Sequence, residues 1–328
     1  MPVLPTPDYK PCPPFRLGNV STLHPSLFRP PPAMPEPETF RIELDDGDFL
    51  DWDLHRSRTG TARGVAVVSH GLEGNSRRKY VLGMARVATG LGLDAACWSQ
   101  RGCSGEPNRL VRGYHSGETG DLHAVLTRCL KVGQYDRAAL IGFSMGGNQI
   151  LKYLGEDPAR VPDAVRAAVV FSTPCDLDGC ERVLALPSRR LYFHYFMRGL
   201  SRKMREKAAM FPDRVDAGQL GKVRTLRDFD DLFTAPANGF RDGTDYYARS
   251  SSLQFLPAIR VPALVVNSLD DPFMPPSCYP VKEAEANPNL YLEMPKYGGH
   301  VGFVLTGNGN VYWSEERTGR FLVERLGL

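Results

Sequence analysis

The sequence predicts an α/β fold in which a mostly parallel β-sheet lies between two layers of helices, with a helical cap inserted late in the chain. Two observations favour this fold class. Short apolar strand patterns alternate with helix patterns over residues 64–171, and the alternation resumes over residues 263–328. Between these regions it stops for roughly 85 residues, which are rich in Arg, Phe and Tyr and contain no clear strand pattern.

The first half of the chain predicts four parallel strands after an initial hairpin. Alternating residues around a D-G turn indicate the hairpin, and continuous apolar runs are typical of strands buried on both faces. Apolar residues every three to four positions, ended by glycine, indicate the helices between them. The predicted strands are residues 39–55 (the hairpin), 64–69, 94–98, 137–141 and 166–171, and the predicted helices are 77–89, 121–131 and 149–154.

The second half predicts the cap and the end of the sheet. A long helix is expected within the inserted region, and two further strands and two helices are expected after it. These elements are the helix 191–210, the strands 263–267 and 289–293, and the helices 276–286 and 311–326.

Composition changes along the chain predict its domain organisation. Residues 1–38 hold twelve of the 27 prolines and predict an extended arm on the surface, with a disordered arm as the alternative. Residues 39–174 and 258–328 are expected to form the core of the fold. Residues 175–257 are expected to form the cap.

Charge and cysteine content limit the class of protein. A net charge of +3 over 328 residues gives no indication of nucleic acid as a partner. The seven cysteines are scattered, without a C-x-x-C pair or a Cys/His cluster, which predicts free thiols and no metal or cofactor. No apolar run approaches the roughly 18 residues of a membrane span, and residues 1–5 do not resemble a signal peptide. A cytoplasmic protein is expected.

The most informative stretch is Gly142-Phe143-Ser144-Met145-Gly146, which matches the G-x-S-x-G pattern of a nucleophile elbow. It lies between a predicted strand and a predicted helix, as that motif requires. A serine in so tight a turn adopts a strained backbone, and the two glycines leave room for the neighbouring strand and helix. A simple glycine-rich turn is the alternative interpretation. We expect Ser144 to be a nucleophile.

Two further residues complete a predicted catalytic triad. Asp271 and His300 follow the last two predicted strands, so that the chain order Ser, Asp, His is that of α/β-hydrolases. A serine needs such a base to take its proton and an acid to orient that base. Asp270 is the alternative acid. Helix capping by an aspartate and simple solvation of the histidine are the structural alternatives.

Backbone N–H groups are expected to stabilise the oxyanion that forms in acyl transfer. Met145, next to Ser144, is one predicted donor. Leu72, in the His70-Gly71-Leu72 loop after a predicted strand, is the other. His70 is expected to brace that loop. The segment 114–121 is expected to form a turn, with helix capping by Thr119 or Asp121.

Several longer motifs resemble one particular family. They are Ser69-His70-Gly71-Leu72-Glu73-Gly74-Asn75-Ser76, Arg101-Gly102-Cys103-Ser104-Gly105, Tyr114-His115-Ser116-Gly117-Glu118-Thr119, the elbow, and Gly298-Gly299-His300-Val301-Gly302-Phe303. Together they resemble the YheT/EMB8-like α/β-hydrolases, relatives of the AB-hydrolase domain proteins 1 to 3. The resemblance implies an α/β-hydrolase fold, a triad of Ser144, Asp271 and His300, and hydrolysis of carboxylic esters or acyl lipids.

The expected function is therefore that of a serine esterase, acting on a small-molecule ester or acyl-lipid substrate through an acyl-enzyme. An acyltransferase with an alcohol or thiol acceptor is the alternative enzyme, and a non-catalytic binding protein is the alternative of another class. Cap aromatics are expected either to line an acyl pocket or to form the core of the cap: Tyr192, Phe193, Tyr195 and Phe196. A basic run is expected to be a solvated face, with peripheral lipid contact left open: Arg198, Arg202, Lys203, Arg205 and Lys207.

Overall fold

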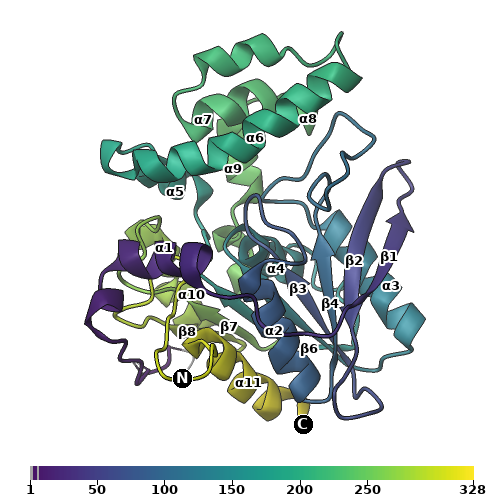
Figure 1. Cartoon of the computed structure of the whole chain (residues 1–328), viewed down its shortest axis with the longest axis vertical. Coiled ribbons are helices and arrows are strands. Elements are labelled where there is room, and N and C mark those ends of the chain that lie inside the picture. The colour runs from purple at the N-terminus through teal and green to yellow at the C-terminus, as the bar shows by residue number, and fades with distance from the viewer. Residues whose placement is uncertain (1–2, 6) are drawn as a thin grey trace.

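The computed structural model describes residues 3–5 and 7–328, which build one eight-stranded sheet. Its strand order is β1-β2-β4-β3-β5-β6-β7-β8, and every pairing from β4 to β8 is parallel (Figure 1). The fold class expected from the sequence is confirmed. The strands are β1 (Glu38–Glu43), β2 (Phe49–His55), β3 (Val65–Ser69), β4 (Asp94–Ser99), β5 (Ala138–Phe143), β6 (Val165–Phe171), β7 (Ala263–Val266) and β8 (Leu290–Glu293).

Burial explains the two kinds of strand pattern. The residues of β3, β4, β5 and β7 are all buried, since helices cover both faces, and their sequences are continuous apolar runs. β1 is an edge strand that pairs antiparallel with β2, and its side chains are mostly exposed. The predicted D-G turn joins these two strands. Gly47 has φ 84° there, and its N–H donates to Leu44 O at 2.9 Å.

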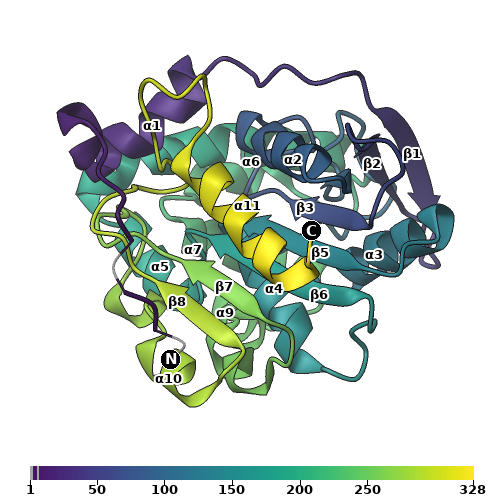
Figure 2. The ribbon, with the colours of Figure 1, turned by 90° about the horizontal axis from the view of Figure 1, so that it is seen from below.

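Helices cover the sheet on both faces. Apolar side chains of α2 (Lys79–Gly90) and α11 (Trp313–Leu326) pack on one face in a single buried cluster (Figure 2). Those of α3 (Gly120–Gly133), α4 (Met145–Glu156) and α10 (Val281–Ala286) belong to the cluster on the other face. The molecule therefore has the three layers that the alternation predicts.

The helix predicted over 276–286 is shorter in the structure. A 3₁₀ turn covers Pro276–Cys278, and α10 begins only at Val281. Pro280 has no N–H to donate and disfavours a helical conformation at Tyr279, which has ψ 84°. The chain therefore leaves helical geometry before α10 starts.

Residues 176–258, called the cap segment from here on, contain no strand. Most of them lie beyond the carboxyl ends of the parallel strands (Figure 1), but the last turn, residues 253–258, packs on the helices beside the sheet. The helix predicted over 191–210 is present as α6. The cap segment has its own apolar cluster, which includes Met197, Leu200 and Phe233. Its elements are α5 (Leu177–Leu184), η2 (Pro187–Arg189), α6 (Arg190–Met210), η3 (Ala217–Lys222), α7 (Leu226–Phe229), the π-helix η4 (Asp230–Thr234), α8 (Ala235–Ala237), α9 (Gly243–Ser250) and η5 (Leu253–Ala258).

The N-terminal arm differs from the prediction. Residues 1, 2 and 6 lie outside the described residues, but the remainder contains η1 (Pro13–Arg16) and α1 (Gly18–Phe28), so an extended arm is wrong for this stretch. Tertiary contacts explain the helix despite Pro25 within it. Ser21 is fully buried, and its hydroxyl donates to Gly298 O at 2.9 Å. Contacts with a distant loop thus outweigh the low helix propensity of the segment.

Candidate active site

The turn between β5 and α4 exposes Ser144 at the edge of the sheet. Ser144 has φ 51° and ψ −121°, a conformation that costs a side-chain-bearing residue about 1–3 kcal/mol. A Cβ on Gly142 would lie 2.8 Å from Gly146 O, and a Cβ on Gly146 would lie 2.5 Å from His70 O. The glycines of the motif are therefore required by the close approach of backbone, as the sequence predicts.

Three side chains from separate loops form one chain of hydrogen bonds. His300 Nε2 lies 2.9 Å from Ser144 Oγ, and His300 Nδ1 lies 2.9 Å from Asp271 Oδ2. The second carboxylate oxygen of Asp271 accepts the Phe273 N–H at 2.9 Å. The loops leave the carboxyl ends of β5, β7 and β8, where open α/β sheets place their ligands. The structure brings together the three residues that the sequence singles out.

Asp270 faces a different partner from its neighbour. Its Oδ1 accepts the Gly299 N–H at 2.8 Å, and its Oδ2, though buried, has no hydrogen-bond partner among the described residues. Burial raises the pKa of the Asp270 carboxyl, opposed in part by the Gly299 N–H. Asp270 braces the loop that carries His300, and the hydrogen bonds of the imidazole within the described residues go to Asp271 and Ser144 instead.

The His300 loop is also held by two hydroxyl groups that the sequence analysis did not identify. Thr22 Oγ1, from α1, accepts the His300 N–H at 2.8 Å. Ser172 Oγ accepts the Val301 N–H at the same distance. The ring of Phe273 packs 4.2 Å from the imidazole ring centre. Neither hydroxyl lies near the histidine in the sequence, so no local pattern points to them.

The loop after β3 leaves one backbone donor free beside Ser144. Gly71 N–H donates to Tyr80 Oη, Glu73 N–H to Tyr114 Oη, and Gly74 N–H to Gly71 O. Among the described residues, the N–H groups of Leu72 and Met145 donate to no protein group. Both residues line the same cavity as Ser144. The two predicted oxyanion donors are thus adjacent to the serine and unoccupied by the protein.

His70 connects this loop to the neighbouring strand. Its Nε2 accepts the Gln100 N–H at 3.1 Å, and its Nδ1 lies 2.7 Å from Gly71 O. Since Nε2 accepts, the proton is on Nδ1 and is donated to that carbonyl. Complete burial lowers the pKa of His70 to about 3. A neutral His70 therefore braces the loop, which agrees with the sequence interpretation.

A buried ion pair joins the cap segment to the same loop. Lys203 Nζ, on α6, donates to Glu73 Oε1 at 2.7 Å, and Tyr114 Oη donates to the same oxygen at 2.5 Å. Lys203 also lies over the Tyr114 ring, 4.7 Å from its centre. The expected solvated position of Lys203 is therefore wrong. Lys207 is buried as well and donates to Asn108 O and Leu110 O.

The expected capping of α3 by Thr119 or Asp121 is also wrong. Thr119 makes no side-chain cap, and its hydroxyl donates to Glu156 instead. Asp121 pairs with Arg101 at 2.7 Å. Glu118 supplies the cap, because its Oε1 accepts the Gly120 N–H at 3.0 Å and the Asp121 N–H at 3.3 Å.

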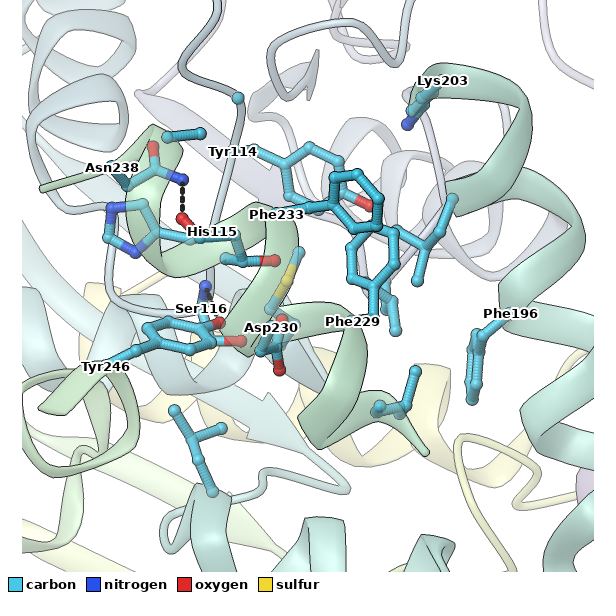
Figure 3. A pocket seen from close by; sticks show the side chains of 18 of the residues that line it. Tyr114, His115, Ser116, Phe196, Lys203, Phe229, Asp230, Phe233, Asn238 and Tyr246 are labelled. Atoms are coloured by element: carbon cyan, nitrogen blue, oxygen red, sulfur yellow. Dashed lines mark hydrogen bonds between the residues drawn. The ribbon is translucent and has the colours of Figure 1, made fainter. Parts of the chain in front are cut away.

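Two cavities meet at Ser144 and His300. The first, called the cap cavity, has a volume of about 180 Å³ and extends beneath the cap segment past Tyr114, Phe229 and Phe233 (Figure 3). The second, called the α1 cavity, has a volume of about 370 Å³ and extends between α1 and the first turns of α6. A substrate carbonyl at Ser144 would therefore have space on two sides.

The cap aromatics divide between the two roles expected for them. Phe196 lines both cavities, and Tyr192 and Tyr195 line the α1 cavity. Phe193 packs against the apolar cluster of the cap segment. Tyr192 also links α6 to α1, because its Oη donates to Asn19 Oδ1 at 2.8 Å.

Two other features are absent from residues 3–5 and 7–328. No group of three or more His, Cys, Asp or Glu side chains is placed to hold a metal ion there. None of the helices in those residues has both the length and the apolar character needed to cross a membrane.

Comparison with known proteins identifies the family. The family model described as the alpha/beta hydrolase fold matches residues 67–305. The chain belongs to the α/β-hydrolase family. This match spans the strands and loops that carry Leu72, Ser144, Asp271 and His300, and it agrees with the order of the strands in the sheet.

Individual proteins show which α/β hydrolases this chain is similar to. It is 35% identical to the putative esterase YheT of Escherichia coli over 88% of this chain and 85% of that protein. It is 33% identical to mouse phospholipase ABHD3 over 85% of this chain and 70% of that protein. The predicted resemblance to YheT/EMB8-like hydrolases is confirmed. Among solved structures, the Pyrococcus furiosus esterase Pf2001 has a similar fold, with a TM-score of 0.59, 17% identity, and coverage of 89% of this chain and 91% of that one.

Proposed function

We propose that this α/β hydrolase is a serine esterase that cleaves carboxylic esters, including acyl lipids, through an acyl-enzyme. The observation that carries the proposal is the continuous hydrogen-bond chain from Ser144 Oγ through His300 to Asp271. The esterase and phospholipase names of its relatives support the same substrate class.

Each residue has a distinct role in the proposed mechanism. His300 Nε2 takes the hydroxyl proton as Ser144 Oγ attacks the ester carbonyl, and Asp271 orients the imidazole and stabilises its cationic form. The N–H groups of Leu72 and Met145 stabilise the oxyanion of the tetrahedral intermediate, each contributing about 3 kcal/mol. His300 then gives its proton to the departing alcohol. Water, activated by the same imidazole, releases the acyl group from Ser144.

We also propose that the cap segment acts as a cap over the reacting groups, with a boundary near the expected residues 175–257. Phe196 and Lys203 support this role, because both come from α6 and line the cap cavity beside Ser144. No metal or cofactor is needed for the mechanism, since the nucleophile, the base and the oxyanion donors all come from this chain.

A fluorophosphonate probe tests the proposal directly. It should label the protein at Ser144, and Ser144→Ala should abolish both labelling and hydrolysis of p-nitrophenyl esters, by about a million-fold in kcat. Thermal unfolding of the variant should match that of the original protein, because the serine hydroxyl faces a cavity and contributes little to packing. Unchanged turnover in the variant would remove the proposed mechanism.

A further inference from the structure

Large apolar side chains are exposed around the mouth of the α1 cavity. Leu27, Leu191 and Tyr195 line this cavity and are nevertheless 63%, 65% and 53% exposed. Phe28, at the end of α1, is 71% exposed. Clustered exposure of this kind is uncommon on a soluble protein and marks surfaces that contact an apolar partner.

These side chains lie on two neighbouring helices. On α6, the exposed residues Leu191, His194, Tyr195 and Arg198 are spaced at i, i+3, i+4 and i+7, so they share one face. Figure 1 shows α1 beside one end of α6, and the hydrogen bond between Tyr192 and Asn19 fixes that end as the first turn. The exposed apolar groups of both helices therefore border one opening.

Three of the segments around this opening contain Lys and Arg but no acid, whereas Glu315, which also lines the α1 cavity, is buried and paired with Arg29 and Arg86. Residues 182–205 contain seven Lys or Arg and no Asp or Glu. Residues 9–35 contain three such cations, residues 74–93 contain four, and neither segment contains an acid. The protein as a whole has 40 cationic and 37 acidic residues, so the separation is local and not a consequence of net charge.

Several of these cations have no anionic partner in the protein. Within the described part of the chain, no carboxylate pairs with Arg190 or Arg198, and both side chains are exposed. Arg78 and Lys79 line the α1 cavity and donate only to backbone carbonyls, those of Glu73 and Ser26. An apolar rim with unpaired cations is complementary to the surface of an anionic lipid bilayer.

We propose that this face, formed by α1, the first half of α6 and the start of α2, docks on anionic lipid surfaces. Leu27, Phe28, Leu191 and Tyr195 insert among the acyl chains, and Arg190 and Arg198 contact the headgroups. The α1 cavity opens within this face and reaches Ser144 and His300, so a lipid can pass from the bilayer to the reacting groups without crossing water. The inference goes beyond esterase activity, because docking is independent of turnover.

Vesicle sedimentation tests the proposal with Ser144→Ala, which leaves the lipid uncleaved. This variant should bind phosphatidylglycerol-containing vesicles at least tenfold more tightly than pure phosphatidylcholine vesicles, and 0.5 M salt should weaken that binding. Adding R190Q and R198Q should weaken binding about fivefold for each cation removed. Adding F28S and L191S to the Ser144→Ala protein should also weaken its binding to the anionic vesicles. Salt should change the size of this loss less than it changes the loss caused by R190Q and R198Q.

Matched variants on another face serve as controls. Arg128 and Arg166 are exposed cations without ion pairs among the described residues, and Val132 and Val323 are exposed apolar residues. R128Q with R166Q, and V132S with V323S, should leave vesicle binding unchanged. R190Q with R198Q should hydrolyse a short soluble ester at the original rate, since neither arginine lines the cap cavity or the α1 cavity.

Four results would overturn the proposal: no binding to anionic vesicles at low salt, equal binding to both vesicle types, equal losses in the control variants, or a dimer in sedimentation velocity that the F28S and L191S changes dissociate. The last result would assign the face to a second copy of the chain. Hydrolysis of a soluble ester reports on the esterase proposal separately, so the two proposals fail independently.

Discussion

Asp270 and Asp271 are neighbours in the sequence, yet the structure gives them separate tasks. Asp271 accepts from the imidazole of His300, and Asp270 accepts from the backbone of Gly299 in the same loop. One carboxylate therefore orients the ring, and the other holds the peptide that carries it. A carboxylate that fixes a histidine tautomer contributes far more to acyl transfer than one that braces a loop.

Asp271→Asn is expected to lower kcat by about three to four orders of magnitude on a soluble ester. Asp270→Asn should lower it about tenfold or less, because an amide oxygen still accepts the Gly299 N–H. Steady-state kinetics of the two variants, with circular dichroism as a control for folding, checks the difference. A larger loss in Asp270→Asn would assign the orienting role to Asp270.

His70 makes the fold sensitive to acid. Burial lowers its pKa to about 3, whereas the unfolded chain protonates histidine near pH 6.5. The stabilisation from neutral His70 is therefore complete above about pH 6.5 and is lost as the pH falls toward 3, because the unfolded state then binds the additional proton. Between pH 7 and pH 5 this loss amounts to about 2 kcal/mol.

Urea unfolding of His70→Asn at pH 7 and pH 5 measures this contribution. Between pH 7 and pH 5, the free energy of unfolding should fall by about 2 kcal/mol less in the variant than in the original protein, whatever the stability of the variant at pH 7. His194→Asn is the matched control, because His194 is exposed on α6 and should leave the pH dependence unchanged. Equal pH dependence in all three proteins would contradict the role assigned to burial of His70.

Helix α6 connects the cap segment to the loop that carries the Leu72 N–H. Lys203 and Tyr114 converge on Glu73, which has φ 55° and follows Leu72 directly. A Cβ on Gly199 would overlap the Glu73 carboxylate, so a glycine in α6 allows this approach. The position of the proposed oxyanion donor, the Leu72 N–H, thus depends on a helix that is distant in the sequence, since Lys203 and Glu73 are 130 residues apart.

Lys203→Met should lower kcat about tenfold to a hundredfold with little change in KM, because a displaced oxyanion donor affects mainly the transition state. Arg202→Met is the matched control, since Arg202 is the exposed neighbour on the same helix and should change neither constant. Ester kinetics and thermal unfolding are measured for both variants. A change confined to KM or to stability would show that Lys203 only holds the cap segment in place.

The junction between sheet and cap segment determines how a substrate lies. The cap cavity and the α1 cavity share Leu72, Ser144 and His300, and they diverge from there into different parts of the molecule. If Ser144 attacks the carbonyl at this junction, the acyl chain and the alcohol occupy different cavities. Each buried methylene then contributes about 0.8 kcal/mol to binding.

An ester with chains on both sides of the carbonyl should therefore be the better substrate. Octyl octanoate should exceed both methyl octanoate and octyl acetate in kcat/KM, by about threefold to fourfold for each methylene that a cavity accommodates. Leu23→Trp narrows the α1 cavity and Ala237→Phe narrows the cap cavity. Each variant should therefore reduce the gain in kcat/KM that comes from lengthening only one of the two chains of the ester. If both variants penalised the same chain, a single binding path would be indicated.

Much of the architecture follows from local patterns in the chain. Continuous apolar runs are sufficient to indicate strands buried on both faces, and every strand from β1 to β8 lies where the hairpin pattern or an apolar run predicts it. The meeting of Ser144, Asp271 and His300 could also be predicted from the sequence, because parallel strands bring the loops at their carboxyl ends to one edge of the sheet. Elements with weaker local signals, such as α10, were predicted with inaccurate bounds.

Contacts between distant segments could not be predicted in the same way. Helix α1 forms around Pro25 because Ser21 and Thr22 bond to the loop of His300, and Thr22 and His300 are 278 residues apart in the chain. Lys203 resembles its solvated neighbours in the sequence but is buried against Glu73. Such interactions carry no periodicity of their own. They arise from the meeting of surfaces after the sheet has formed, when the cost of leaving a buried polar group unpaired selects the partner.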